Sequence, residues 1–143
     1  MSDEDPEAEL SIMNIDLLYT GSDLFMLPHA EVAEVIDTLL PTIIDTLASY
    51  NGVLESVSNC RMIAVFSAAE DHALKSVLCA SKLHSDIRTL TEERVACGKR
   101  PVKLRIGIAS GHAKLQNFKH AQYSGVSHVG EPLAQAELLA AIA

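Results

Sequence analysis

The sequence predicts an α+β domain with a ferredoxin-like βαββαβ core, followed by one further strand and one further helix. Two observations lead to this fold class. Short apolar runs of strand length alternate with longer stretches in which apolar residues recur every three or four positions, the spacing of a helix that covers a core. In chain order these segments read β-α-β-β-α-β and then β-α, the order of an antiparallel sheet with helices packed on one face. The 143 residues suffice for one such domain.

The first half of the chain is expected to hold a tail, a strand, a helix and a strand hairpin. Residues 1–9 are acidic and are expected to form a disordered tail. Residues 10–18 alternate loosely, which predicts a first strand, and residues 29–50 have apolar side chains at helical spacing. Pro41 removes one backbone donor, so we expect this helix to kink or divide there. The two strands predicted for the hairpin are residues 53–57 and 62–66.

The second half begins with the longest predicted helix, residues 69–95. Gly98 and Pro101 follow it, and these two residue types commonly mark the end of a helix. Its apolar residues are expected to form one stripe that faces the core: Ala73, Leu74, Val77, Leu78, Leu83, Ile87 and Leu90.

Two more strands and a closing helix complete the predicted fold. Residues 102–108 are expected to form a buried strand, in which Gly107 and the following Gly111 leave room for a close neighbour. A shorter strand is expected at residues 122–128 and a helix at residues 131–143. The segment between the two strands is interpreted as a solvated loop. Its basic side chains would make a small positive spot: His112, Lys114, Lys119 and His120.

Composition limits the classes of partner. The formal net charge is −8, and 19 residues are Asp or Glu. Nucleic acid and anionic membranes repel a negative surface, so we expect neither as a partner. No apolar run reaches the roughly 18 residues that span a bilayer, so no membrane insertion is expected. The widely spaced Cys60, Cys79 and Cys97 are expected to be reduced thiols in the cytoplasm, not a disulfide or a zinc site.

Three segments carry a resemblance to a known family. They are Asn51-Gly52 with the hairpin ending NCRMIAVF, then VKLRIGIASG at 102–111, then YSGVSHVGEPLAQA at 123–136. In this order and spacing they resemble the class III nucleotide cyclase catalytic domain, which makes cAMP or cGMP, over residues 10–143. The resemblance implies a nucleoside triphosphate ligand, Mg²⁺ or Mn²⁺, and a dimer whose subunits share each active site. It also implies that the family's C-terminal hairpin is absent, because the chain ends at Ala143.

The family's two divalent metals clamp the attacking and leaving oxygens and need carboxylate ligands. Asp16, at the end of the first predicted strand, matches one family aspartate. Asn59 and Cys60 fall on the Gly-Asp pair that supplies the second, and a thiol is a poor ligand for Mg²⁺. Tyr19 stands where a glycine of the phosphate-binding turn is expected. With one matching carboxylate, Mg²⁺ or Mn²⁺ is expected to bind weakly.

The family's remaining functional positions are also changed. The base-reading residues fall on Ser56 and Ser127, which discriminate adenine from guanine poorly, so a preference for ATP or GTP stays open. The asparagine that positions the ribose falls on Ala134, and the arginine that meets the developing phosphate charge falls on Leu138. Preorganised donors of this kind contribute roughly 3 kcal/mol each. Losing both is therefore expected to slow turnover by about four orders of magnitude.

These positions predict a catalytically degenerate cyclase homology domain that acts as a dimerising or regulatory module. It would form a homodimer, or a heterodimer with a cyclase-like domain, and bind nucleotide weakly. One alternative is an active adenylate or guanylate cyclase, either completed by an intact partner or using substitute ligands. Those ligands would be Asp16 with Asp23, or Glu131 near the phosphates, and His128 is a further candidate. A second alternative is a ferredoxin-like scaffold without a nucleotide role.

Overall fold

The computed structural model describes residues 7–19, 28–58, 60–67, 71–120, 123–129 and 131–142. Its strands form one antiparallel sheet in the order β2-β3-β1-β4-β5. The elements are β1 (Glu7–Tyr19), α1 (His29–Ser49), β2 (Gly52–Ser58), β3 (Arg61–Phe66), α2 (His72–Ala96), β4 (Val102–His120), β5 (Tyr123–Val129) and α3 (Glu131–Ile142). The predicted α+β fold, with its βαββαβ core and additional strand and helix, is confirmed.

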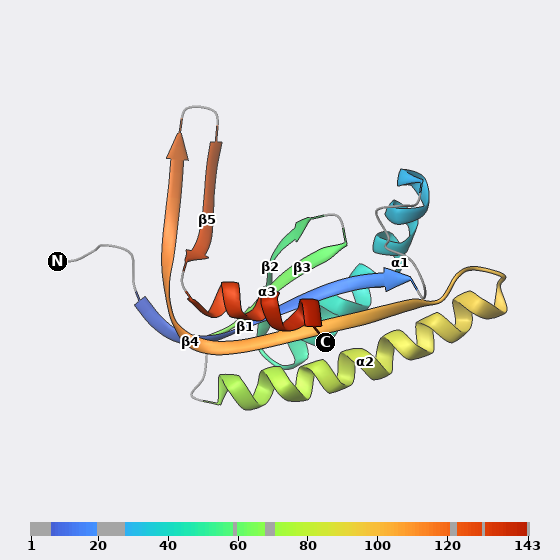
Figure 1. The fold of residues 1–143 in the computed structure, drawn as a ribbon, viewed down its shortest axis with the longest axis horizontal. Coiled ribbons are helices and arrows are strands. Elements are labelled where there is room, and N and C mark those ends of the chain that lie inside the picture. Colours follow the sequence, from blue (N-terminus) through green and yellow to red (C-terminus); the bar gives the residue numbers. More distant parts are fainter. Residues whose placement is uncertain are drawn as a thin grey trace.

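The sheet separates two apolar layers, because alternate side chains of a strand point to opposite faces. On one face, Met13, Ile15 and Leu17 of β1 pack against α1 and α2. On the other face, Leu10 and Ile12 belong to a smaller cluster beneath α3. Figure 1 shows α2 running along the sheet, with α3 on the side nearer the viewer. None of the helices within the described ranges is long and apolar enough to cross a membrane.

Helix α1 runs through Pro41 as one helix, so of the two effects expected of this proline, a kink or a division, the division does not occur. Leu39 and Ile43, on either side of the proline, are fully buried against the sheet. Their packing holds the helix together, because it outweighs the loss of a single backbone hydrogen bond.

The apolar stripe predicted for α2 is only partly right. Leu83 and Ile87 are buried as expected, but Leu74, Val77 and Leu78 are exposed. The buried face of α2 combines apolar and polar side chains: His72, Ser76, Cys79, Leu83, Ile87 and Arg94. At the first turn of α2, the buried His72 ring forms a 2.7 Å hydrogen bond between its Nδ1 and Ser11 Oγ on β1, so this polar residue is satisfied inside the fold.

An ion-pair cluster joins α1 to the end of α2. The Glu34 carboxylate accepts hydrogen bonds from both Thr38 Oγ1 and Arg94 Nη1, and from Lys99 Nζ at 3.2 Å. The Thr38 bond is the largest cause that lowers the pKa of Glu34 to about 2, and the bonds from Arg94 and Lys99 add to it. Arg94 is buried although it is charged. Arginine side chains are seldom fully buried unless they are paired, as Arg94 is with Glu34.

In two strands, the boundaries differ from the prediction by more than one residue. β1 begins at Glu7, so residues 7–9 extend the strand instead of the tail, while residues 1–6 lie outside the described part. β4 continues to His120, so the segment interpreted as a loop is strand. Residues 114–120 of β4 pair with β5, and this pairing satisfies backbone hydrogen-bonding groups of both strands. The sequence did not predict this part of the strand, because it lacks the alternation of apolar and polar residues that indicates a half-buried strand.

The two glycines of β4 have the predicted close neighbour. A Cβ at Gly107 would meet the backbone of α3, at Ala136 O and Ala140 N. A Cβ at Gly111 would meet the ring of Pro132 at 3.0 Å. Ala136 and Ala140 lie one turn apart and are fully buried. Small residues on both elements therefore let α3 approach the strand at backbone distance.

Candidate functional site

Asp16 lies near the end of β1, and only 6% of the residue is exposed. Its Oδ1 accepts one hydrogen bond from Asn14 Nδ2 at 3.1 Å and another from Arg61 Nε at 3.0 Å. Asn14 shares its face of the sheet because strand side chains repeat with a period of two. The register pairs Asp16 directly with Arg61 on β3, so the guanidinium reaches the carboxylate across the strands. The residue predicted as a metal ligand is thus held in an ion pair.

Arg61 connects Asp16 to α3, since its Nη1 lies 3.5 Å from Glu137 Oε2. The hydrogen bond to Asp16 raises the pKa of Arg61, partial burial opposes the rise, and the charge of Glu137 adds to it. Sequence reasoning missed both partners. Arg61 follows Cys60 directly in the chain, but only strand register reveals that it faces Asp16. Nothing in the sequence indicates that Glu137, which is 76 positions beyond Arg61, lies beside it in the fold.

A second arginine lies beside Asp16 in the sheet. The register pairs Asp16 with Arg105 on β4 as well as with Arg61 on β3. Directly opposed residues on neighbouring strands project to the same face. Asp16 therefore lies between two cationic residues. Together with Glu137, which Arg61 also contacts, this corner therefore contains two acidic and two basic side chains.

Cys60 does not join Asp16. It packs beside the core formed with α1 and α2, whereas Asp16 contacts Arg61, which reaches α3 on the other face. Its neighbour Asn59 lies outside the described residues. No three or more His, Cys, Asp or Glu side chains in the described ranges are grouped so that they could hold a metal ion. Of the two metal-ligand positions that the resemblance implies, one holds the Asp16 carboxylate and the other the Cys60 thiol.

The other predicted site positions lie on β2, α3 and β5. Ser56 is exposed on β2, opposite Ile63, which lies on the α3 face. Ala134 and Leu138 are exposed on α3 and lie one turn apart, so they share one side of the helix. Neither side chain has a hydrogen-bonding group. Ser127 is opposite Gln116 in the β4–β5 ladder, and its side chain is outside the described part.

The candidate substitute ligands lie outside what the structure describes. Asp23 is not among the described residues, and for His128 and Glu131 only the backbone is described. His128 is opposite Leu115 in the strand ladder, and Glu131 is the first residue of α3.

No protein-family model matches the chain, and no curated protein matches its sequence. Solved structures do match its fold. The guanylyl cyclase Cya2 superposes with a TM-score of 0.86 at 18% identity, over 96% of this chain and 72% of that one. The adenylyl cyclase CyaB from P. aeruginosa gives a TM-score of 0.84 at 17% identity, over 96% and 74%. The chain has the nucleotide cyclase fold.

A third neighbour with this fold is the guanylyl cyclase domain of the RhoGC fusion protein from the aquatic fungus Blastocladiella emersonii. A structure described as a non-canonical dimer matches with a TM-score of 0.79 at 13% identity, over 95% of this chain and 75% of that one. A monomeric structure of the same domain matches with a TM-score of 0.78 at 13% identity, over 96% and 78%. At these identities the likeness concerns the fold.

On this cyclase fold, the corner of β1, β3 and α3 holds a chain of ion pairs from Asp16 through Arg61 to Glu137. The chain ties α3 to the sheet. Within this chain, both donors to Asp16, Asn14 Nδ2 and Arg61 Nε, bond to the same oxygen, Oδ1.

Proposed function

We propose that this protein is a catalytically degenerate class III nucleotide cyclase homology domain that acts as a dimerising or regulatory module. The observation that carries the proposal is the ion pair between Asp16 and Arg61, at 3.0 Å, at the position where the resemblance expects a metal ligand. The Arg61 guanidinium keeps its positive charge beside this carboxylate at any ordinary pH, because arginine does not deprotonate in proteins. We propose that Mg²⁺ or Mn²⁺ and a nucleoside triphosphate bind only weakly.

The transition-state positions support the same proposal. Ala134 and Leu138 occupy the places of the ribose-positioning asparagine and the phosphate-contacting arginine in the resemblance. Both are exposed on α3, and neither can donate a hydrogen bond to a phosphate. Without preorganised donors, the developing charge of a phosphoryl transfer stays unstabilised. The two donors and the metal ligand would all stabilise the transition state of the same phosphoryl transfer. We therefore expect the loss of the donors, or the loss of the metal ligand, to be enough to abolish ordinary turnover.

Exposed apolar side chains support an association role. Leu138 is 67% exposed on α3, and its neighbour Leu139 is also exposed. Val53 is 66% exposed on β2. It pairs with Val65, a member of the cluster beneath α3, so it projects to the same side of the sheet as that helix. Covering each such side chain stabilises an interface by about 1.5–3 kcal/mol. We propose that a second copy, or a cyclase-like domain, covers this surface in the cytoplasm.

Two measurements on the full chain test the proposal. In the first, the protein is incubated with ATP or GTP and Mg²⁺ or Mn²⁺, and cyclic nucleotide is quantified. We expect no product. Product at an ordinary enzymatic rate would establish an active cyclase and would move the catalytic groups to Asp23, His128 or Glu131.

The second measurement is sedimentation velocity at tens of micromolar, a range suited to transient interfaces. We expect a dimer for the unmodified chain and a monomer for Leu138→Glu. The matched control is Leu74→Glu, which places the same charge on an exposed leucine of α2, on the opposite side of the sheet. This control is expected to stay dimeric. A monomeric unmodified chain, or equal behaviour of the two variants, would contradict an interface on α3.

A further inference from the structure

Four polar side chains form one hydrogen-bonded row near the beginning of β1, away from the corner of Asp16. Ser110 Oγ lies 2.6 Å from Ser11 Oγ, and Ser11 Oγ lies 2.7 Å from Nδ1 of His72. On the other side of the ring, Nε2 lies 3.3 Å from Oε1 of Glu9. The four residues come from β1, β4 and α2. Serine, histidine and a carboxylate joined in this sequence are the components of an activated nucleophile.

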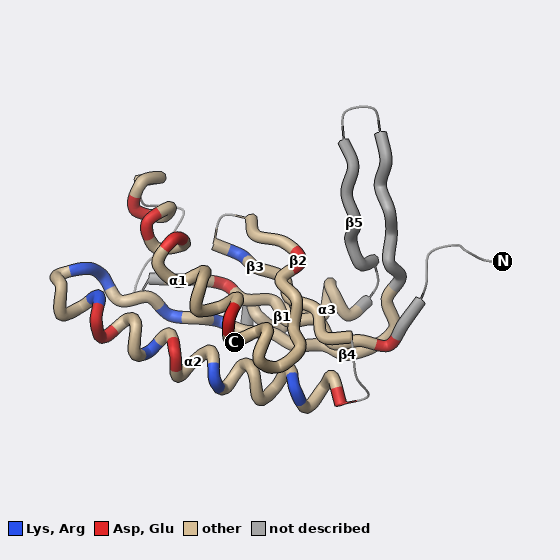
Figure 2. Tube along the Cα trace, turned by 180° about the vertical axis from the view of Figure 1, so that it is seen from behind, with Lys and Arg blue, Asp and Glu red and all other residues tan. Residues whose placement is uncertain are grey.

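The register of the sheet brings these side chains together. Ser11 of β1 is directly opposite Ser110 of β4, so both side chains project to the same face. Glu9 is two residues before Ser11 and shares that face. The face is the one that α1 and α2 cover, and His72 is the first residue of α2. Figure 2 shows acidic residues at the beginning of β1 and of α2 at the same end of the molecule.

The acceptors determine the direction of the hydrogen bonds in this row. A carboxylate only accepts, so the ring nitrogen that faces Glu9, Nε2, carries the proton of the neutral imidazole. Nδ1 of His72 is then an acceptor, and Ser11 Oγ donates to it. Because Ser11 has one O–H group, Ser110 donates the remaining hydrogen bond to the Ser11 oxygen. Every donor therefore points from Ser110 toward Glu9.

Burial separates the base of this row from its nucleophile. Ser11 is fully buried and His72 is 6% exposed, so neither side chain meets a dissolved substrate directly. Ser110 is exposed, and its side chain stands on the face of the sheet, not at the hydrogen-bonding edge of β4. A proton can therefore pass from Ser110 to the imidazole through the buried hydroxyl of Ser11.

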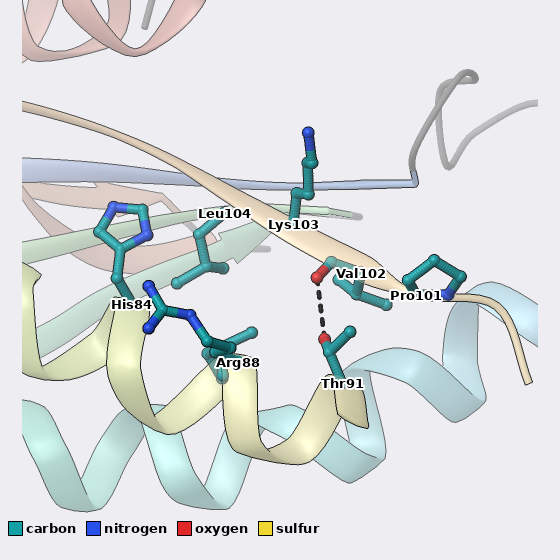
Figure 3. Close-up of a pocket in the computed structure, with 8 residues that line it drawn as sticks. His84, Arg88, Thr91, Pro101, Val102, Lys103 and Leu104 are labelled. Atoms are coloured by element: carbon teal, nitrogen blue, oxygen red, sulfur yellow. Dashed lines mark hydrogen bonds between the residues drawn. The ribbon is translucent and has the colours of Figure 1, made fainter. Parts of the chain in front are cut away.

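A second histidine of α2 has different surroundings. His84 lies about three turns beyond His72, is exposed, and lines a groove beside the beginning of β4. Figure 3 shows His84 and Arg88 on α2, and the hydrogen bond drawn there joins Thr91 to Val102. Between the described residues, no hydrogen bond joins His84 to a serine. It is thus a matched control for the buried histidine.

We propose that Ser110 is a nucleophile that takes an acyl group from an activated ester, with His72 as its general base and Ser11 as the proton relay. Ser110 Oγ forms a bond to the carbonyl carbon, and the bond from that carbon to the leaving oxygen breaks. The proton of Ser110 moves to Ser11 as the proton of Ser11 moves to Nδ1 of His72, and it then returns through Ser11 to the departing oxygen. The Glu9 carboxylate stabilises the transient imidazolium.

The strength of this activation determines the class of acyl donor. General-base assistance contributes about 10²–10⁴ to a rate, and a complete hydrolase site adds stabilisation of the oxyanion. A donor that depends on the base must carry a good leaving group, such as a phenolate. The row shares no residue with the Asp16 corner or with α3, so the proposal does not depend on the function proposed above.

The test incubates the full chain with p-nitrophenyl acetate. Absorbance follows the release of nitrophenolate, and peptide mass spectrometry over time locates the acetyl groups, because lysines also react. We expect acetylation of Ser110 to be at least about tenfold faster than acetylation of Ser81, an exposed serine of α2 in the same molecule.

Variants separate the relay from the simple exposure of a serine. Ser11→Ala leaves Ser110 in place but interrupts the relay. His72→Asn keeps an acceptor for Ser11 but supplies no base, so it preserves a merely structural role. Each change is expected to slow acetylation of Ser110 at least about tenfold. The matched control His84→Asn makes the same exchange on the same helix and is expected to leave the rate unchanged. Circular dichroism and urea denaturation verify that each variant is folded.

Three results would contradict the proposal. The first is acetylation of Ser110 no faster than that of Ser81. The second is an unchanged rate at Ser110 in a folded His72→Asn protein. The third is loss of the acetylation in His112→Gln. His112 is exposed and lies opposite Glu9 in the ladder, so this loss would identify it as the base in place of His72.

Discussion

Gly107 offers the most direct test of how α3 is held on the sheet. An added Cβ would overlap the backbone of α3 at Ala136 O and Ala140 N and would lie 2.9 Å from Leu139 C. Backbone atoms cannot rotate away as the end of a side chain can, so Gly107→Ala must push the helix off the strand. Gly107→Val adds two methyl groups at the same place and should do so more severely.

The expected cost can be compared within the same strand. Gly111→Ala meets only the ring of Pro132, at 3.0 Å for the nearest atom, and a ring can change its pucker. Replacing glycine in a strand also recovers roughly 0.5–1 kcal/mol of backbone entropy, so Gly111→Ala should be nearly neutral. Gly107→Ala should lower the free energy of unfolding by about 1–3 kcal/mol, and the melting temperature by about 3–9 °C.

Urea denaturation and thermal unfolding of the two variants provide the measurement. Amide hydrogen exchange of residues 131–142 then shows whether α3 loosens before the sheet unfolds. Because the overlap is with backbone, truncating Leu139 to alanine should not restore the stability of Gly107→Ala. If Gly107→Ala proves as stable as Gly111→Ala, α3 does not approach β4 at backbone distance and the packing argument fails.

Further predictions concern ion pairs and thiols. Glu34→Gln should lower stability at neutral pH. Because the pKa of Glu34 is lowered from 4.5 to about 2, its contribution is present above pH 4.5 and is lost as the pH falls toward 2. Urea titrations at several pH values should therefore show the two proteins converging in acid, and a constant difference would contradict it. Arg61→Met should cost about 1–2 kcal/mol, because it leaves the Asp16 carboxylate with fewer donors, and Asp16→Asn in the same chain should recover part of the loss. A strictly additive double-mutant cycle would argue against the pair. With a disulfide reagent, exposed Cys97 should react in the folded protein. Cys79 should react only on unfolding, because burial raises its pKa to about 11; rapid labelling of both would show that α2 opens readily.

The order and type of the elements could be predicted from the sequence because local patterns specify them. Helical spacing of apolar residues identified α1, and Gly98 with Pro101 marked the end of α2. The glycines of β4 indicated a close neighbour before that neighbour was known. These signals depend on residues near one another in the chain, so a single sequence carries them.

Only the tertiary structure decided what each side chain faces. The sequence marked Asp16 as the one carboxylate that matches a family metal ligand, but it could not show that Asp16 is hydrogen-bonded to Arg61 from the neighbouring strand while Cys60 packs on the α1 and α2 side of the sheet. The rotation of α2 also differs from the prediction, because the helix buries the face with Cys79, Leu83 and Ile87 and leaves Leu74 exposed. Contacts of this kind depend on strand register and helix rotation. Both are set by the packing of the whole domain, so they are not encoded in any local segment of the chain.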